Sequence, residues 1–591
     1  METARRSRIR EALLVVGGSL AASIAFTWPL VLHLNSRARD LHDTLFQAWT
    51  IDWVQHAVGS GINPYNANIF APERTSLAFS DTLLGIAIPA LPLRWLGMTP
   101  IGVLNVTIIV GLAASAAAAY LFARLATGSR LVAVVAGAAY AFGPFGALSA
   151  RHVHVAFRPG VPLAAAAAWW LVERVRTAEP GASWRRLLPS AGALVAVVAW
   201  QGTISFYLAT YAIIAAAVVL LARWRALGKR GVLVAAGALA ASAVLLAILA
   251  IPNLAVQSRD PSYTFTLADF DLNGANFGQT EPGLSVYGSI LGLGEKDTMR
   301  NALFPGFALL GFAIAGAISG WRAGGRRKTA TITGLALIVV GALLAIGTSD
   351  SDWRKYAPYR VLYELVPPFD ALRATARAWM IGLLGLGLLA GFGALALARW
   401  LGRKTPSRPR RAPALVGVLV VVLFLAEGFD PWFDRPDARI PPVDAELAQR
   451  PPGGVVYLPM NVANDLNIGY RAQPKNLYGA TAHHRITPNG YAGYIPGSYV
   501  VQSKGLWTLP DANAIGLLRE LGVRYVVVHP RAVDGPWARL RDPATARPLE
   551  HVGTYGNDLL YELPPPSPSP PTLDRATPGP CGGALRCTQY S

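Results

Sequence analysis

The sequence predicts an α-helical polytopic membrane protein with about eleven transmembrane helices and a small C-terminal α/β domain. Hydrophobic residues make up 53% of the 591 residues and charged residues only 15%, a composition typical of membrane proteins. Apolar runs of about 17–23 residues, enough to cross roughly 30 Å of hydrocarbon, recur before residue 430. After that point, β-branched runs and Pro-rich stretches replace them.

The charge pattern orients the predicted helices. The chain carries a net charge of +19, but its Lys and Arg residues form short clusters between apolar runs, at 5–10, 174–186, 223–230, 321–328 and 403–411. This placement follows the positive-inside rule and argues against a nucleic-acid partner. We expect a multi-pass protein of the plasma (inner) membrane, with a cytoplasmic N-terminus and an uncleaved signal anchor.

We expect membrane spans at about 11–31, 101–123, 131–149, 159–173, 188–202, 204–222, 231–252, 303–320, 329–347, 378–399 and 412–428. The stretch 188–222 is too long for one span and has a polar break near Gln201, so two short helices with a tight turn fit best. Charge phasing places loop 32–100 outside. It also requires that 82–98 is an interfacial or re-entrant element.

The domain boundary is expected near residue 430. Residues 1–430 form the predicted transmembrane domain, and 431–565 form an extracytoplasmic α/β domain with strands at 453–460, 524–530 and 559–564 and a helix at 511–522. The Pro-rich tail 566–591 is predicted to be disordered. It holds Cys581 and Cys587, which form either one small disulfide loop or two unpaired thiols.

The first external loop carries the main candidates for chemistry. Asp43 lies where the first membrane helix emerges, with Asp40 and His42 within one turn. A carboxylate there can act as a general base toward an acceptor hydroxyl or bind a divalent cation such as Mg or Mn; the alternative is an ordinary solvated acid. The following segment 45–58 has Trp residues on an amphipathic pattern, which suits either an interfacial helix or a helix packed on the soluble domain.

Other polar groups gather at predicted outer helix ends. Loop 63–81 carries Glu73 and Asp81, which either line a substrate cleft or cap turns. His152, His154 and Arg158 follow in the next outer loop, where they can contact a phosphate or cation. These three are candidate substrate-binding residues, although the His-x-His spacing does not put both rings on one helical face.

Two further arginines, Arg373 and Arg377, are spaced four apart before the span at 378–399. On one helical face they would form a clamp for a pyrophosphate or polyprenyl phosphate. Ordinary snorkelling to lipid headgroups is the alternative.

Several stretches together resemble the GT-C superfamily of polytopic membrane glycosyltransferases, including the glycosyltransferase-39, RgtA/B/C/D-like and YfhO-like groups. The resemblance covers most of the chain and rests on Asp43 after the first helix, ANIFAPERTSLAFSDTLLG (67–85), LRATAR (372–377), NGYAGYIPGSY (489–499) and LLRELGVRYVVVH (517–529). It implies a sugar donor carried on a polyprenyl phosphate, direct attack with inversion, and Asp43 at the catalytic acid position.

One departure matters for this resemblance. Many members carry a second acid in the next external loop, where this chain reads ARHVHVAFRPG. Either Asp81, Glu73 or the histidines substitute, or transfer activity is lost. The sequence thus predicts a membrane glycosyltransferase with a glycan, lipid or protein acceptor. The alternative is a non-enzymatic relative that acts as a lipid or glycan transporter or as an envelope assembly factor.

Overall fold

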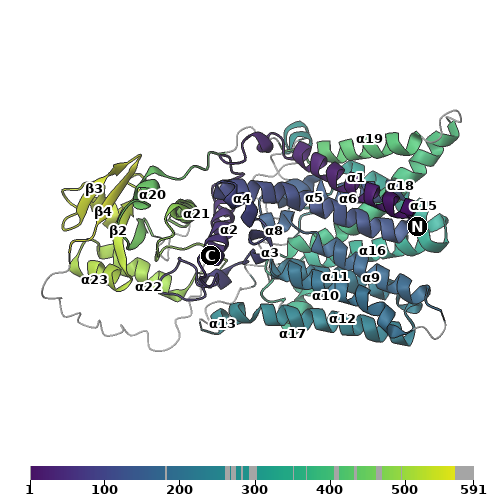
Figure 1. Cartoon of the computed structure of the whole chain (residues 1–591), viewed down its shortest axis with the longest axis horizontal. Coiled ribbons are helices and arrows are strands. Elements are labelled where there is room, and N and C mark those ends of the chain that lie inside the picture. Colours follow the sequence, from purple (N-terminus) through teal and green to yellow (C-terminus); the bar gives the residue numbers. More distant parts are fainter. Residues whose placement is uncertain are drawn as a thin grey trace.

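The computed structural model consists of a helical bundle and a smaller C-terminal part that contains a sheet (Figure 1). It describes residues 2–179, 183–259, 267, 275–280, 284–291, 302–350, 352–367, 369–404, 411–430, 436–460, 469–493 and 495–565. Most of loop 253–302 and the tail with Cys581 and Cys587 therefore lie outside the described residues.

Each of the eleven predicted apolar runs contains a helix. These are α1 (Glu2–Phe26), α5 (Pro100–Thr127), α6 (Arg130–Ala141), α9 (Gly160–Arg176), α10 (Leu188–Gly202), α11 (Phe206–Ala222), α12 (Gly228–Leu249), α15 (Phe307–Arg322), α16 (Gly325–Ala345), α18 (Trp379–Lys404) and α19 (Ala412–Glu427). Six helical stretches in the described part of the chain are long and apolar enough to cross a membrane, and four shorter helices are also apolar. The chain is a multi-pass membrane protein, whereas the number of eleven spans stays a prediction.

Local signals set the helix ends. The Thr99 side chain accepts a hydrogen bond from the Gly102 N–H at the start of α5, and Pro100 occupies the first helical position. The same helix ends at Gly128, whose φ of 74° is a conformation that favours glycine. The predicted break within 188–222 is confirmed, because α10 ends at Gly202 and α11 begins at Phe206.

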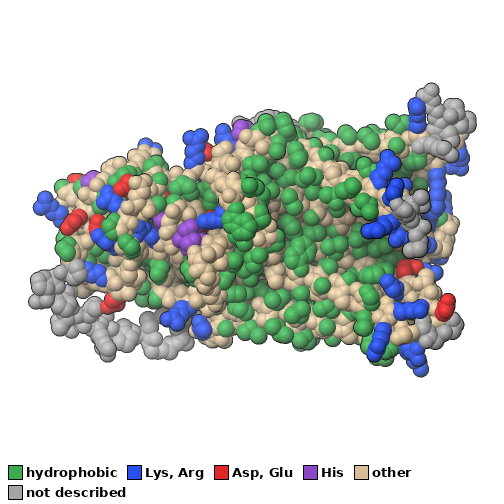
Figure 2. Space-filling model, in the orientation of Figure 1, with side chains coloured by type: hydrophobic (Ala, Val, Ile, Leu, Met, Phe, Trp, Pro, Cys, Tyr) green, Lys and Arg blue, Asp and Glu red, His purple; other side chains and the backbone are tan. Residues whose placement is uncertain are grey.

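Helix α18 lies in the middle of the bundle and packs against α6, α15 and α16. Its contact with α15 depends on glycine, because a Cβ on Gly316 would lie 1.8 Å from the Leu389 carbonyl oxygen and one on Gly393 would lie 2.1 Å from that of Phe312. Helices in lipid associate by close packing of small residues at their interfaces. Hydrophobic side chains cover the middle of the bundle, and Lys and Arg gather at the end that carries the N-terminus (Figure 2).

The C-terminal part contains a four-stranded sheet in the order β1-β2-β4-β3. Strands β1 (Gly454–Leu458) and β2 (Val523–Val528) are parallel and buried, with helix α23 (Ala512–Glu520) preceding β2. Strand β4 (Asp558–Glu562) pairs antiparallel with both β2 and β3 (Glu550–Tyr555). The predicted strands and helix are present, and the half-exposed β3 was not predicted.

Helix α2 (Asp43–Gly59) lies between the bundle and the C-terminal part, where it packs against α5 and α21 (Gly469–Gly479) (Figure 1). The prediction that this segment forms an interfacial helix in contact with lipid headgroups is therefore wrong, since Trp49 and Trp53 are 1% and 4% exposed. Its polar face also meets protein: the Gln55 amide donates to the Ala87 carbonyl oxygen at 2.9 Å. The helix is thus a buried joint between the two parts.

Candidate functional site

Two carboxylates and two histidines form a row at the end of the bundle that faces the C-terminal part. We call Asp43, His152, His154 and Asp81 the acid–histidine row. His152 Nε2 lies 3.0 Å from Asp43 Oδ2, and His154 Nε2 lies 3.5 Å from Asp81 Oδ2. The two imidazole rings lie edge to face with centroids 5.6 Å apart. The structure therefore joins four of the predicted site residues.

Helix N-termini position both acids. Asp43 is the first residue of α2, a 17-residue helix. Asp81 lies between η2 (Ser76–Phe79) and α3 (Leu84–Ala87), and it faces the Ser205 hydroxyl and the Phe206 N–H at the start of α11. The positive end of a helix dipole stabilises a nearby carboxylate. The N-terminus of α2 thus favours negative charge on Asp43, and the N-terminus of α11 offsets part of the cost of burying Asp81.

The C-terminal part contributes a side chain to the row. The Tyr491 hydroxyl donates a hydrogen bond to Asp43 Oδ1 at 2.6 Å, and its ring packs edge-on against Phe46 of α2 with centroids 5.2 Å apart. The two oxygens of Asp43 thus contact different parts of the protein, Oδ1 the Tyr491 hydroxyl and Oδ2 the His152 ring.

An arginine lies beside the Asp81 end of the row. The Arg377 guanidinium lies over the Tyr207 ring of α11, 5.2 Å from its centroid, and its positive charge acts on Asp81. Burial raises the pKa of Asp81 above its usual range, while the charge of Arg377 opposes that rise. The Asp81 side chain is 16% exposed, so this end of the row is largely dehydrated.

Binding of Mg or Mn stays a prediction. Among the residues that the structure describes, no three His, Cys, Asp or Glu side chains converge to hold a metal ion. The row consists of two acid–imidazole pairs, Asp43–His152 and Asp81–His154, whose imidazole rings contact each other.

Six predicted substrate-binding residues lie outside the row, three of them in the first external loop and three arginines described below. Asp40 accepts hydrogen bonds from the backbone N–H groups of His42 and Thr44 and from the Thr44 hydroxyl, so its carboxylate caps the start of α2. His42 is exposed at the N-cap of that helix. Glu73 is partly exposed in loop 63–81, and within the described ranges no recorded hydrogen bond or ion pair joins it to the row.

Arg158 has a different environment from the one that the sequence suggested. It is fully buried, and its guanidinium donates to the Ser149 hydroxyl at 2.7 Å and to the carbonyl oxygens of Val155 and Tyr140 at 2.9 and 2.7 Å. The expectation of a contact with a lipid phosphate is wrong, because protein groups surround the guanidinium. Arg158 therefore stabilises, through these hydrogen bonds, the segment that carries the two histidines.

The predicted helical face for Arg373 and Arg377 is not formed. Arg373 precedes the short helix η8 (Thr375–Ala378), and its carbonyl accepts the Thr375 N–H at 2.9 Å in a turn. The two side chains are both partly buried, and both lie within electrostatic range of Tyr207. They are therefore near each other, but the spacing of four residues does not bring them together by helix geometry.

Loop 63–81 packs against the C-terminal part. The N–H groups of Phe70 and Ala71 donate to the carbonyl oxygens of Asn489 and Thr487, both at 3.0 Å, and the Thr487 N–H donates to the Asn68 carbonyl at 2.9 Å. These backbone bonds resemble those of paired strands. Much of the loop thus serves as a docking surface for 487–489, next to Tyr491.

A second polar cluster at the same junction was missed. The buried Asp52 of α2 pairs with Arg94 of α4 (Leu91–Trp95), and its Oδ2 lies 2.7 Å from His484 Nε2. The His484 ring stacks on His56 at 3.8 Å. Neither cluster was predictable from spacing, because Tyr491 and His484 lie more than 400 residues from their acidic partners.

Comparison with known proteins gives a likeness of fold. No family model matches the sequence, and no curated protein is similar to it in sequence. The structure is similar to the crystal structure of the oligosaccharyltransferase of Archaeoglobus fulgidus in the apo form, with a TM-score of 0.50 and 12% identity over 94% of this chain and 74% of that chain. ArnT from Cupriavidus metallidurans bound to undecaprenyl phosphate gives a TM-score of 0.48 and 13% identity over 94% of this chain and 98% of that chain.

Proposed function

We propose that the chain transfers a sugar from a polyprenyl-phosphate donor to an acceptor hydroxyl on the extracytoplasmic face of the plasma membrane. Its fold supports this proposal, because the resemblance to GT-C membrane glycosyltransferases that was expected from the sequence is confirmed at the level of fold. The observation that carries this proposal is the acid–histidine row, which lies where Tyr491 of the C-terminal part contacts Asp43.

In this proposal Asp43 is the general base. An acceptor hydroxyl that donates to Asp43 loses its proton as it attacks the anomeric carbon, and the bond to the lipid phosphate breaks. Tyr491 and His152 keep the carboxylate oriented through their contacts of 2.6 and 3.0 Å. A positioned base of this kind contributes about 10²–10⁴-fold to a rate.

Arg377 and Arg373 would bind the phosphate of the donor. The departing polyprenyl phosphate carries negative charge, and guanidinium groups bind phosphate oxygens through paired hydrogen bonds. Asp81 and His154 lie beside Arg377 and would orient its guanidinium. Asp81 would also take the place of the second acid, which the second external loop of this chain lacks. The C-terminal part would shape the acceptor site, since it supplies Tyr491.

The alternative is a non-enzymatic membrane protein on the same scaffold. A transporter needs ionisable groups deep within its helices, whereas the row lies at the bundle end. The distribution of polar groups therefore favours chemistry at a lipid headgroup.

The test uses purified full-length protein in detergent micelles with a panel of polyprenyl-phosphate sugars, and it measures release of polyprenyl phosphate. Asp43→Asn is expected to lower release by at least about 100-fold. Glu364→Gln removes an exposed carboxylate and serves as the matched control. Undiminished release by Asp43→Asn would reject the role of Asp43. Binding of donor without any release by the unaltered protein would favour the non-enzymatic alternative.

A further inference from the structure

An arginine-lined cavity lies at the opposite end of the bundle from the acid–histidine row. We call it the arginine cavity. It measures about 550 Å³ and is lined by Arg176, Leu221, Ala222, Arg223, Trp224, Arg225, Ala226, Gly325, Arg326 and Thr329. Helices α9 and α11 begin at the row and end at this cavity, so the two lie about 25 Å apart along these helices.

Arg223 is the buried donor of the cavity. Its side chain is 4% exposed, and its guanidinium lies 3.8 Å from the centroid of the Trp169 ring. One nitrogen, Nη2, donates to Glu173 at 2.6 Å. Its Nε and Nη1 have no hydrogen-bond partner in the described part of the chain. Leaving charged N–H groups buried and unpaired is costly, so a ligand that accepts both would be strongly stabilised.

Positive charge exceeds negative charge around the cavity. Glu173 is the carboxylate recorded there, and it is shared by Arg223, Arg176 at 3.1 Å and Arg326 at 4.0 Å. Arg326 also donates to two carbonyl oxygens at the end of α5, which fixes it beside the cavity. Arg225 adds a further exposed guanidinium. One shared carboxylate thus leaves a net positive site.

We propose that the arginine cavity binds a phosphate group, carried either by an anionic lipid or by a soluble phosphate compound. Nε and Nη1 of Arg223 supply the buried donors, and Arg225 supplies a peripheral charge. Guanidinium groups pair with phosphate oxygens in this way. The rim carries Leu221 and Trp224, which are 69% and 58% exposed and suit the acyl chains of a lipid.

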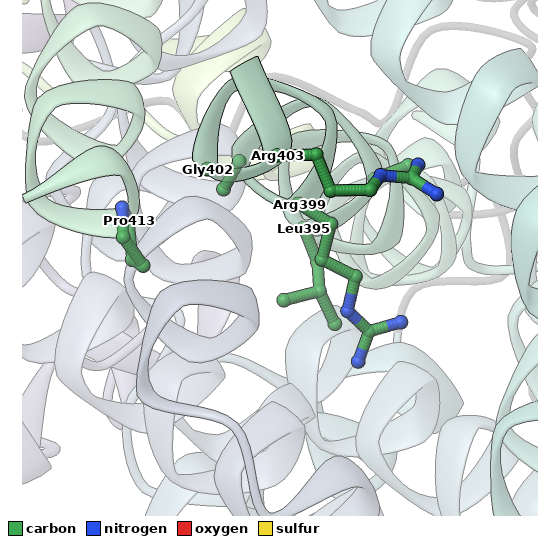
Figure 3. Close-up of a pocket in the computed structure, with 7 residues that line it drawn as sticks. Leu395, Arg399, Gly402, Arg403 and Pro413 are labelled. Carbon is green, nitrogen blue, oxygen red and sulfur yellow. The ribbon is translucent and has the colours of Figure 1, made fainter. Parts of the chain in front are cut away.

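A second arginine-lined cavity provides the comparison. It measures about 680 Å³ and lies beside α18 and α19. Figure 3 shows Arg399 and Arg403 extending away from Pro413, and both residues are exposed. This cavity is also lined by arginines, but both of them are exposed. Substitution of Arg399 therefore shows how much binding depends on positive charge at the protein surface in general.

The experiment uses full-length protein in detergent, with native mass spectrometry to measure binding of short-chain phosphatidylglycerol. Phosphatidylcholine and inorganic phosphate are separate probes. Arg223→Gln is expected to weaken binding of phosphatidylglycerol about tenfold and Arg225→Ala about threefold, while Arg399→Ala stays within about twofold. Because Arg225 is exposed, its variant keeps the test valid if Arg223→Gln does not fold.

Each outcome decides the proposal. Dependence on Arg223 and Arg225 for phosphatidylglycerol alone supports a lipid site. The same dependence for inorganic phosphate supports a site for a soluble phosphate compound. If Arg225→Ala binds every probe as the unaltered protein does, or if Arg399→Ala weakens binding equally, the site is rejected.

Discussion

Replacing Tyr491 with Phe separates the contribution of the C-terminal part from that of the membrane bundle. The substitution removes the hydroxyl that donates to Asp43 at 2.6 Å and retains the ring that packs against Phe46. The fold should therefore persist, while the orientation of the Asp43 carboxylate becomes less restricted.

The size of the effect follows from the type of bond. A hydrogen bond to a charged group contributes about 1.5–3 kcal/mol, which corresponds to roughly 10- to 150-fold in rate if the whole bond serves catalysis. The remaining partner, His152, still holds the other oxygen at 3.0 Å. We therefore expect Tyr491→Phe to lower kcat/KM for sugar transfer about tenfold, the low end of that range.

A double-mutant cycle provides the assay. Release of polyprenyl phosphate is measured for Tyr491→Phe, Asp43→Asn and the double variant. If Tyr491 acts through Asp43, its substitution in the Asp43→Asn background should cost no more than about twofold. Tyr555→Phe is the matched control, because it removes a hydroxyl on strand β3 of the C-terminal part, outside the acid–histidine row.

Additive effects of the two substitutions would refute this reasoning, because they would mean that Tyr491 does not act through the carboxylate. Loss of activity in Tyr491→Phe alone, even with an unchanged melting temperature, would not show that Tyr491 acts through Asp43. The decisive quantity is the coupling between the two sites.

Three further substitutions or conditions test the junction and the interior. Burial and the charge of Arg94 lower the pKa of His484 to about 4 from its ordinary 6.5. The folded protein therefore favours the neutral ring. This contribution to the free energy of unfolding is complete above pH 6.5 and is lost as the pH falls toward 4. Acidification should therefore weaken the junction by up to about 3 kcal/mol, seen as faster amide exchange at 484–490, and His484→Gln should flatten this dependence. Gly490→Ala places a Cβ 2.2 Å from the Phe70 ring and should destabilise the same junction by about 1–3 kcal/mol, measured as a lower melting temperature. Arg158→Gln removes buried charged donors and should lower the free energy of unfolding by about 3 kcal/mol. Detergent-extracted protein should then lose its cooperative melting. An unchanged melting curve together with a raised KM for the donor would instead support the phosphate-binding role.

Much of the helical fold was predictable from the sequence. Membrane helices follow from runs of apolar residues, a local property that needs no knowledge of neighbours. The break between α10 and α11 was predictable for the same reason, because polar residues near Gln201 interrupt one long run. Strand β3 was missed since its residues are largely exposed or half-exposed and show little alternation.

The candidate site was predictable only in part. Asp43, Asp81 and the two histidines were identified because charge phasing places them in predicted external loops at the outer ends of apolar helices. Their pairing was not predictable, because it depends on the packing of distant loops. Arg158 was misjudged for the same reason: its sequence position suits a phosphate contact, and only the surrounding carbonyl groups reveal its structural role.

The hydrogen bond between Tyr491 and Asp43 also has a consequence for biogenesis. The two residues are 448 positions apart, so the bundle can enter the membrane while the tyrosine has not yet been synthesised. A nascent chain that has inserted its helices holds Asp43 and His152 without this partner. The order of translation would thus delay the last contact to Asp43 until the C-terminal part has emerged and docked.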